Sequence, residues 1–282
     1  MQKTLKKYFC FFALPTVIAF IIAFLAPFLM GIYLSFCKFT TITNAKWVGM
    51  ANYVKIFTDP EHDFMNALWF TTKFTVVSVI TINVFAFALA MLLTREIKGT
   101  NLFRTVFFMP NLIGGIVLGY IWQLLINGVL MKFGVTITYD AKYGFWGLIV
   151  LMNWQLIGYM MIIYIAGIQN IPGDLMEAAH IDGANGWQTL LHVTIPNVMP
   201  SITICTFLTL TNSFKMFDQN LALTAGGPGK QTQMLALDIY KTFYGRNGWE
   251  GVGQAKAVIF FLMVAVIAFL QLRFTRSKEV EN

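Results

Sequence analysis

The chain has 282 residues, of which 57% are hydrophobic, 16% aromatic and only 12% charged. This composition excludes an ordinary soluble domain and indicates a polytopic membrane protein with several spans. The formal net charge of +7 could indicate a nucleic-acid partner, but no lysine or arginine stands between Lys142 and Lys215. Because the remaining cations flank apolar runs, we attribute them to membrane topology and expect membrane lipid, with no nucleic acid, around this chain.

Six apolar segments are long enough to cross a bilayer as helices, since the hydrocarbon core needs about 20 apolar residues. The segments cover residues 9–36, 68–93, 105–127, 145–168, 197–217 and 255–274. Prolines within them, and the glycines Gly114, Gly115 and Gly119 in the third, predict kinked and closely packed helices. The sequence therefore predicts an all-α protein in which residues 1–282 form a single transmembrane domain with six spans.

Cations near the ends of these segments predict the orientation. They fall on one side, at higher density than in the long loops opposite: Lys3, Lys6, Lys7, Arg95, Lys98, Arg104, Arg273, Arg276 and Lys278. An excess of lysine and arginine marks the cytoplasmic side, so both termini are expected there. The first apolar segment is too long for a cleaved signal sequence and is interpreted as a span.

The insert at residues 169–196, between the fourth and fifth segments, is polar, lacks lysine and arginine, and lies on the predicted cytoplasmic side. Asp174, with Glu177 three residues on, predicts a helix start related to a capping box. Gly183 permits a turn, and a second helix is expected from about Trp187 to the end of the insert. Amphipathic helices that lie on a membrane are usually basic, so this acidic insert favours docking into a partner groove.

The insert also carries a motif. Its order Glu-Ala-Ala, two residues, Asp-Gly-Ala, and a proline twelve residues later resembles the EAA loop of ABC-importer permeases. In that family the loop is the cytoplasmic coupling helix, which sits in a cleft of the ATP-hydrolysing subunit. Leu190 stands where many members carry phenylalanine, and leucine can fill the same kind of apolar pocket. The resemblance implies coupling roles for Glu177, Ala178, Ala179, Asp182, Gly183, Ala184, Leu190 and Pro196.

The chain shows no nucleotide site of its own. The stretch Gly226–Thr232 differs from a phosphate-binding loop, because Thr224 stands where the first glycine is required and Gln231 where serine or threonine must follow the lysine. We therefore expect no enzyme activity and no cofactor in this chain. The family resemblance implies that ATP and Mg are bound by a partner ATPase.

The resemblance also implies the other partners. These are a second, homologous permease subunit in a heterodimer, a cytoplasmic ABC ATPase dimer and an extracytoplasmic sugar-binding protein, all at a bacterial or archaeal cytoplasmic membrane. Binding of ATP by the partner can drive the permease only if the partner favours one permease conformation over another. The insert is where that differential contact would be made.

A second resemblance concerns the substrate. Residues 209–218, followed by Leu-Thr-Ala-Gly-Gly-Pro at 223–228, resemble the fifth span and GGP loop of the maltose-transporter-like permeases. Further matches at Asp238-Ile-Tyr-Lys and Gln271-Leu-Arg-Phe extend the resemblance over nearly the whole chain. In that branch the sugar sits between the fourth and fifth spans. The resemblance implies sugar contacts at Trp154, Gln155, Tyr159, Thr209, Asn212, Ser213 and Met216.

The spacing of these residues predicts two helical stripes. Gln155 and Tyr159 are four residues apart, and the four residues from Thr209 onward follow the pattern i, i+3, i+4, i+7. Amide, hydroxyl and aromatic groups suit the hydroxyls and ring faces of a neutral sugar. The same groups could instead form hydrogen bonds between helices. Lys215 is interpreted as a structural lysine that snorkels to the membrane surface and pairs with Asp218.

Three alternatives stay open on the sequence alone. The first is a permease for another polar solute, such as a polyol or glycerol phosphate. The second is an ion-coupled secondary transporter, which predicts charged residues at midmembrane, where these segments show none. The third is an intramembrane enzyme, for which no catalytic motif is present. The three histidines and three cysteines also lack the spacing of metal ligands.

Overall fold

A computed structural model describes residue 11 and residues 13–58, 64–95 and 98–277. His62, Cys10, Lys278 and the three N-terminal lysines used above lie outside this described part. Within it, six helices are long and apolar enough to cross a membrane, as predicted: Ala13–Ser35, Phe64–Leu93, Gly115–Phe133, Ala141–Gln169, Gly186–Phe214 and Glu250–Arg276. The chain divides into two compact units, one of residues 1–62 and 239–262 and the other of residues 63–238 and 263–282.

The first unit is built on the N-terminal span, in which η1 (Ile21–Leu25) continues into α2 (Ala26–Ser35). The chain then forms a small antiparallel hairpin of β1 (Cys37–Lys38) and β2 (Lys46–Trp47) around η2 (Ile42–Asn44), followed by α3 (Ala51–Thr58). The amide of Asn52 on α3 donates to the carbonyls of Ser35, at 2.8 Å, and Cys37, at 2.9 Å. The first bond satisfies a carbonyl at the end of α2, and the second ties α3 to β1. The last turns of α12 (Leu235–Tyr244) and the first turns of α13 (Glu250–Arg276) complete this unit.

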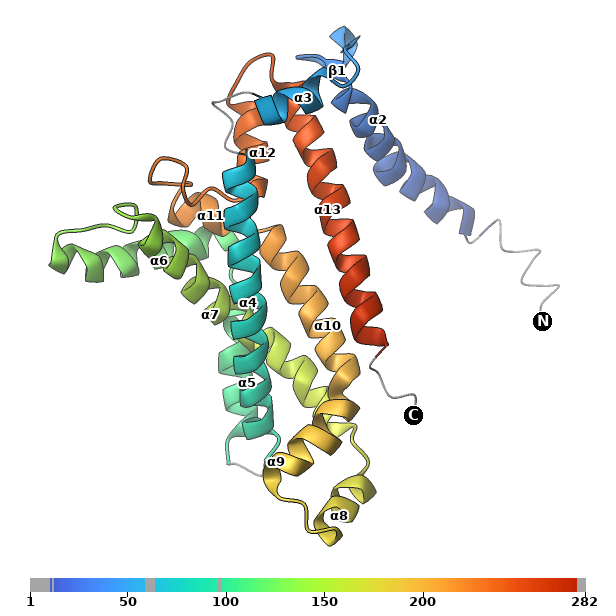
Figure 1. The fold of residues 1–282 in the computed structure, drawn as a ribbon, viewed down its shortest axis with the longest axis vertical. Coiled ribbons are helices and arrows are strands. Elements are labelled where there is room, and N and C mark those ends of the chain that lie inside the picture. The colour runs from blue at the N-terminus through green and yellow to red at the C-terminus, as the bar shows by residue number, and fades with distance from the viewer. Residues whose placement is uncertain (1–10, 12, 59–63, 96–97, 278–282) are drawn as a thin grey trace. The chain divides into compact units, whose positions relative to one another are not determined.

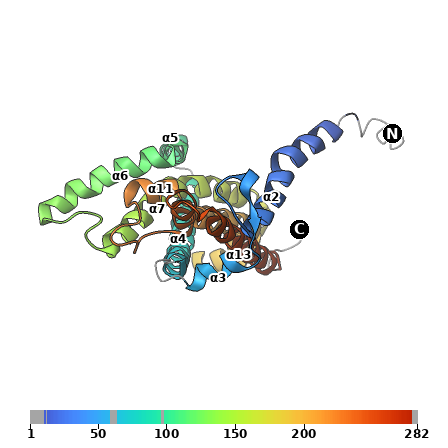
Figure 2. The same ribbon diagram turned by 90° about the horizontal axis from the view of Figure 1, so that it is seen from above.

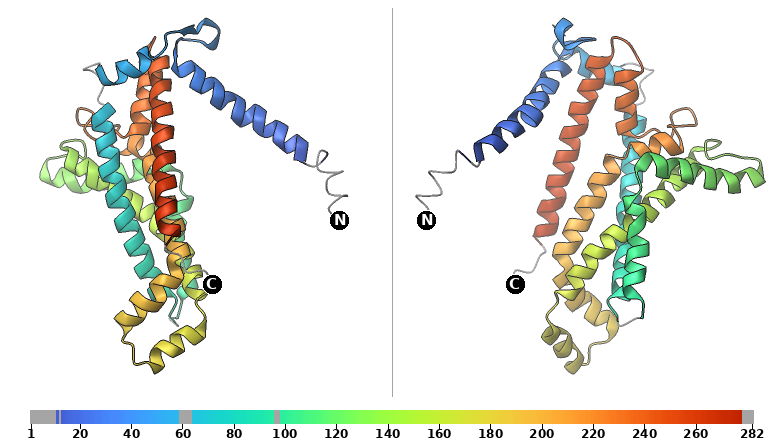
Figure 3. Two further views of the ribbon diagram at one scale, coloured as in Figure 1. Left: turned by 45° about the vertical axis from the view of Figure 1, so that its right-hand side comes forward. Right: turned by 180° about the vertical axis from the view of Figure 1, so that it is seen from behind.

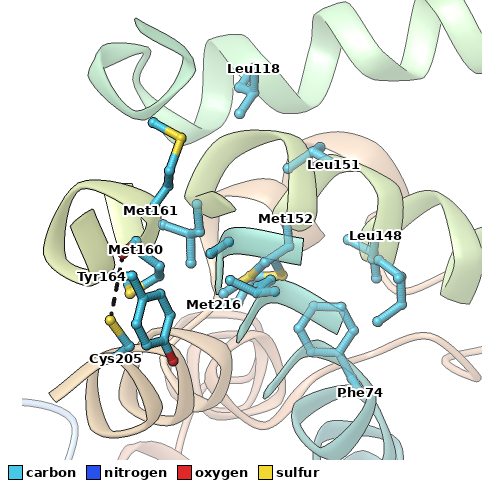
Figure 4. Packing of buried hydrophobic residues seen from close by; sticks show 14 of the residues in the cluster. Phe74, Leu118, Leu148, Leu151, Met152, Met160, Met161, Tyr164, Cys205 and Met216 are labelled. Atoms are coloured by element: carbon cyan, nitrogen blue, oxygen red, sulfur yellow. Dashed lines mark hydrogen bonds between the residues drawn. The ribbon is translucent and has the colours of Figure 1, made fainter. Parts of the chain in front are cut away.

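The second unit is centred on α4 (Phe64–Leu93) and α7 (Ala141–Gln169), with α10 (Ile195–Phe214) packed against both. Figure 4 shows the core between them, where Met152 and Met216 meet and the thiol of Cys205 donates to the carbonyl of Met160 at 3.7 Å. Methionine side chains are flexible enough to fill the irregular space between crossing helices. Polar bonds add to this packing, because the hydroxyl of Tyr164 on α7 donates to the amide oxygen of Asn83 on α4 at 2.7 Å.

The predicted third span, residues 105–127, is wrong as a single helix. The chain instead forms α5 (Thr100–Phe108), η3 (Met109–Leu112) and α6 (Gly115–Leu130). Pro110 lacks the N–H that a continuing helix needs, and Gly114 is extended, with φ −60° and ψ 139°. Figure 1 shows α5 running along α4 and α6 turning away from it, and in the view from above α4 and α5 are seen end-on and α6 lengthwise (Figure 2).

Glycines hold the two halves of this broken segment in place. A Cβ atom at Gly158 of α7 would overlap the carbonyl of Phe107 in α5, so these two helices touch backbone to backbone. On α6, a Cβ at Gly119 would lie 2.6 Å from that of Ala222 in α11 (Asp218–Leu223). The predicted close packing is therefore confirmed at Gly119, and also at Gly115, whereas Gly114 has no neighbour within 4 Å.

The remaining elements complete the second unit. A short turn, η4 (Met131–Phe133), ends the third candidate span and leads to α7. After α7 come α8 (Gly173–Ile181), α9 (Gly186–Thr189) and η5 (Leu190–Thr194), which continues into α10 without a break.

Replacing Gly158 by alanine tests the contact between α5 and α7. We expect the free energy of unfolding to fall by about 1–3 kcal/mol, the usual cost of inserting a methylene-sized group into a packed contact. Gly128→Ala is the matched control, because Gly128 lies in α6 with nothing within 4 Å of its Cβ position. Thermal unfolding of the purified protein in detergent measures both variants. Equal midpoints for the two would contradict the backbone contact.

Candidate functional site

Residues 173–194, called the hairpin below, form the first candidate site. They comprise α8, a turn at Gly183 with φ +74°, then α9 and η5. The predicted helix, turn and helix are therefore confirmed. Figure 3 shows the hairpin at the end of the second unit where α4 ends and α5 begins.

Two details of that prediction are wrong. Asp174 lies inside the first turn of α8, whose N-cap is Pro172 with no side-chain cap; the capping box is instead at Asn185 and Gln188, with bonds of 2.9 and 2.8 Å. The second helix also continues beyond Pro196, since residues 186–214 are helical throughout. The π-helical turn η5 ends at Thr194, two residues before Pro196, whose missing N–H interrupts the regular bonding.

The residues predicted to couple to an ATPase divide into two groups by exposure. Glu177, Ala178, Asp182 and Gly183 are exposed, whereas Ala179 is buried within the protein. Beside them, Ile181 is 84% exposed and Trp187 73% exposed. Large apolar side chains this exposed on a polar hairpin indicate a surface that a partner covers.

Leu190 and Ala184 face inward. Both line a hollow of about 640 Å³ between the hairpin and the ends of α4 and α7, where Arg95 and Ile168 also lie. Pro196 lies half-buried in the continuous helix. Seven of the eight predicted coupling residues thus lie in the hairpin and Pro196 lies two residues beyond it, but they do not share one exposed face.

The second candidate site is a cavity of about 570 Å³ between α7, the break before α6, and the junction of α10 with α11. We call it the polar cavity. Its walls are formed by Asn111, Met152, Gln155, Leu156, Tyr159, Leu208, Asn212, Lys215, Met216 and Gln219. Amide, phenol and ammonium groups therefore line one cavity together with four apolar side chains, and such a mixture can bind a small polar molecule.

Four of the seven predicted sugar-contacting residues line this cavity: Gln155, Tyr159, Asn212 and Met216. The structure brings residues of both predicted stripes together across the cavity. Gln219 donates to Gln155 at 2.8 Å, and the amide nitrogen of Gln155 donates to the carbonyl of Ile113 at 3.4 Å. Gln155 is therefore held in position by a residue from each of the other two walls.

The other three predicted residues do not line the cavity. Thr209 and Ser213 are fully buried, and their hydroxyls donate along the helix to the carbonyls of Cys205, at 2.8 Å, and Thr209, at 2.7 Å. Trp154 is 44% exposed and lies edge-on against Trp122, with 5.7 Å between ring centroids. Asn83 of α4 also donates to the hydroxyl of Thr209 at 3.4 Å, so for Thr209 the structure shows the bond between helices that the sequence left open as an alternative. The bond of Ser213 stays within its own helix, and Trp154 makes a ring contact.

Sequence reasoning missed three polar residues of the cavity, namely Asn111, Lys215 and Gln219. Two signals pointed to them. Asn111 directly follows Pro110 at a helix break, and Gln219 stands seven residues after Asn212, one further step on the same helical stripe. No ion pair joins Lys215 to Asp218 among the described residues, since Lys215 lines the cavity and Asp218 lies beside Gly115 of α6.

Known proteins resemble this chain over most of its length. Residues 82–280 match the family described as binding-protein-dependent transport system inner membrane component. The chain belongs to this family. It is 45% identical to the probable starch degradation products transport system permease protein AmyD of Thermoanaerobacterium thermosulfurigenes, over 96% of this chain and 94% of AmyD.

Further relatives extend the match across the full length. The multiple sugar-binding transport system permease protein MsmF of Streptococcus mutans is 31% identical over 99% of both chains. Among solved structures, a chain of a bacterial ABC transporter involved in import of the acidic polysaccharide alginate has a TM-score of 0.81 and 20% identity, covering 98% of each chain. The fold is thus that of an ABC importer permease, an all-α membrane protein with six spans.

Proposed function

We propose that this chain is the membrane-spanning permease subunit of an ATP-driven importer of mono- or oligosaccharides. The polar cavity is the observation that carries the proposal. Its amides and Tyr159 offer donors and acceptors for sugar hydroxyls, while Met152, Leu156 and Leu208 offer an apolar surface for ring faces. The names of AmyD and MsmF, both of which refer to carbohydrates, support a saccharide over other polar solutes.

The position of the cavity along its helices supports alternating access. Gln155 lies about 21 Å from the hairpin end of α7, and Asn212 about 24 Å from Pro196, at 1.5 Å of rise per residue. Each wall therefore lies more than half the thickness of a hydrocarbon core, about 30 Å, away from the hairpin. Movement of the helices would give a ligand held there a route to the hairpin side.

The hairpin is proposed as the coupling surface. Its motif residues are Glu177, Ala178, Ala179, Asp182, Gly183, Ala184 and Leu190, together with Pro196 just beyond it in α10. A separate ATPase dimer receives the hairpin, binds ATP together with Mg, and hydrolyses the ATP. The exposed side chains of Ile181 and Trp187 support such a partner, because exposed apolar groups are stabilised by burial in a groove. The proposal also includes a second homologous permease and an extracytoplasmic sugar-binding protein, in a bacterial or archaeal cytoplasmic membrane.

Uptake by the reconstituted complex tests the substrate site. We expect uptake of a neutral oligosaccharide such as labelled maltotriose or arabinotriose into ATP-loaded proteoliposomes. Asn212→Leu should reduce uptake about tenfold, because a lost hydrogen bond to a buried ligand costs about 1–3 kcal/mol. Thr211→Val is the control, since the hydroxyl of Thr211 bonds to the carbonyl of Phe207 in its own helix. Equal uptake by both variants would contradict the site.

Replacing Gly183 by valine tests the coupling role. A β-branched residue at φ +74° is strained by about 1–2 kcal/mol, so the turn of the hairpin should change shape. We expect loss of sugar-dependent ATP hydrolysis and of uptake, with unchanged insertion into the membrane. Gly186→Ala is the control, because the Cβ position of Gly186 meets nothing within 4 Å and its φ is not left-handed. Full sugar-dependent hydrolysis in Gly183→Val would refute coupling through the hairpin.

The proposed orientation places both termini and the hairpin in the cytoplasm. Single cysteines at His180 and at Lys230, both exposed, should then react with a membrane-impermeant thiol reagent from opposite faces of the membrane. Labelling in intact cells and in inside-out vesicles measures this directly. Labelling of both positions from the same face would overturn the topology.

A further inference from the structure

Lys215 carries the single formal charge among the described side chains that line the polar cavity. It is the C-cap residue of α10, and its N–H bonds to the carbonyl of Thr211 at 3.1 Å. The carbonyl end of a helix carries a partial negative charge, which favours a cation at this position. No aspartate or glutamate lines the cavity with it, so the positive charge is not neutralised by a neighbouring wall residue.

Some of the other polar side chains of the cavity are hydrogen-bonded to each other, and some are not. Gln155 and Gln219 are bonded to each other at 2.8 Å. Asn111 and Asn212 line the same space, and their side chains form no hydrogen bond to another described residue. A ligand in the cavity would therefore meet two free amides, the hydroxyl of Tyr159 and one ammonium group, and the ammonium group alone can donate up to three hydrogen bonds.

We propose that Lys215 is a specificity-determining substrate contact that restricts the cavity to neutral and acidic saccharides and excludes protonated amino sugars. This inference rests on the proposed function, because it assigns the class of solute that the polar cavity accepts. A positive charge acts more strongly on a group held beside it in a cavity than on a group in open water. Hydroxyl and carboxylate oxygens are attracted to it, whereas an ammonium group on a sugar is repelled.

The first test measures the potential of the cavity without any sugar. A cysteine replaces Asn212 in a complex whose Cys10, Cys37 and Cys205 are changed to alanine. The probes are two methanethiosulfonates of similar size, one carrying a sulfonate and one a trimethylammonium group. The measured quantity is the rate of reaction with the anionic probe divided by the rate with the cationic probe. We expect this ratio to be about three- to tenfold higher at the cavity cysteine than for a free thiol in solution, as one nearby charge partly screened by salt predicts. No preference for the anionic probe would overturn the proposal, and this result requires no change at Lys215.

Variants of Lys215 then assign the effect. Lys215→Gln should abolish the preference, Lys215→Glu should reverse it, and Lys215→Arg should retain it. Lys73→Gln is the matched control, because Lys73 lies 4.8 Å from the ring centroid of Trp69 and lines a different hollow. If Lys215→Gln keeps the preference of the parent, or if Lys73→Gln abolishes it equally, the charge does not come from Lys215 and the proposal fails.

Uptake of labelled maltotriose separates the two proposals. In a wild-type complex that takes up maltotriose, Lys215→Gln should lower uptake about tenfold, and Lys215→Arg should recover part of it. Unchanged uptake in Lys215→Gln would overturn the contact while leaving the importer function intact. Absence of uptake of both maltotriose and arabinotriose in the wild type would instead count against the proposed function, and the labelling ratios would still decide whether Lys215 sets the potential.

Discussion

The structure depends on one constraint, which is that a backbone inside a bilayer must satisfy its own hydrogen bonds. Continuous helices meet this requirement, and interrupted backbone is tolerated only where protein or a water-filled cavity surrounds it. The second unit includes one interruption of helical backbone at residues 109–114 and another at residues 215–217. Both border the polar cavity, which Asn111 enters from the first and Lys215 and Met216 from the second. The cavity therefore lies where the helices break, because that is where side chains and carbonyls can turn toward a ligand.

The breaks are held by specific contacts. The amide of Gln155 on the unbroken helix α7 donates to the carbonyl of Ile113, which the first interruption leaves without a helical partner. Gln219, just after the second interruption, donates to the oxygen of the same Gln155 side chain. One glutamine thus connects both interruptions, and loss of either bond would leave a buried polar group unpaired. Gly119 adds a close backbone approach between α6 and α11, so these two elements are packed as one body.

The same helices connect the cavity with the hairpin. Residues 141–169 and 186–214 are each helical throughout, and each has one end in the hairpin region and contributes a wall of the cavity. A continuous helix transmits a displacement of its end along its length, whereas a flexible loop would absorb it. A partner that moves the hairpin would therefore change the shape of the cavity. It favours one conformation of the permease over another only if it binds the two with different affinity. Between these two helices, the backbone at Gly183 is left-handed, so any side chain at this position would be strained.

The sequence by itself determined the all-α class, the six apolar helices, the paired helices of the hairpin and the family, since these follow from local properties such as apolar length, glycine position and motif spacing. Only the tertiary structure decided which polar residues face the cavity. Thr209 and Ser213 share a stripe with Asn212 in an ideal helix, yet they pack inside the protein because α4 and α7 cover their side of α10. Lys215 stands beyond the end of that helix, where the backbone turns and the helical periodicity no longer fixes the direction of a side chain. Local patterns specify helices, whereas the facing of a side chain at a helix break depends on what packs around it.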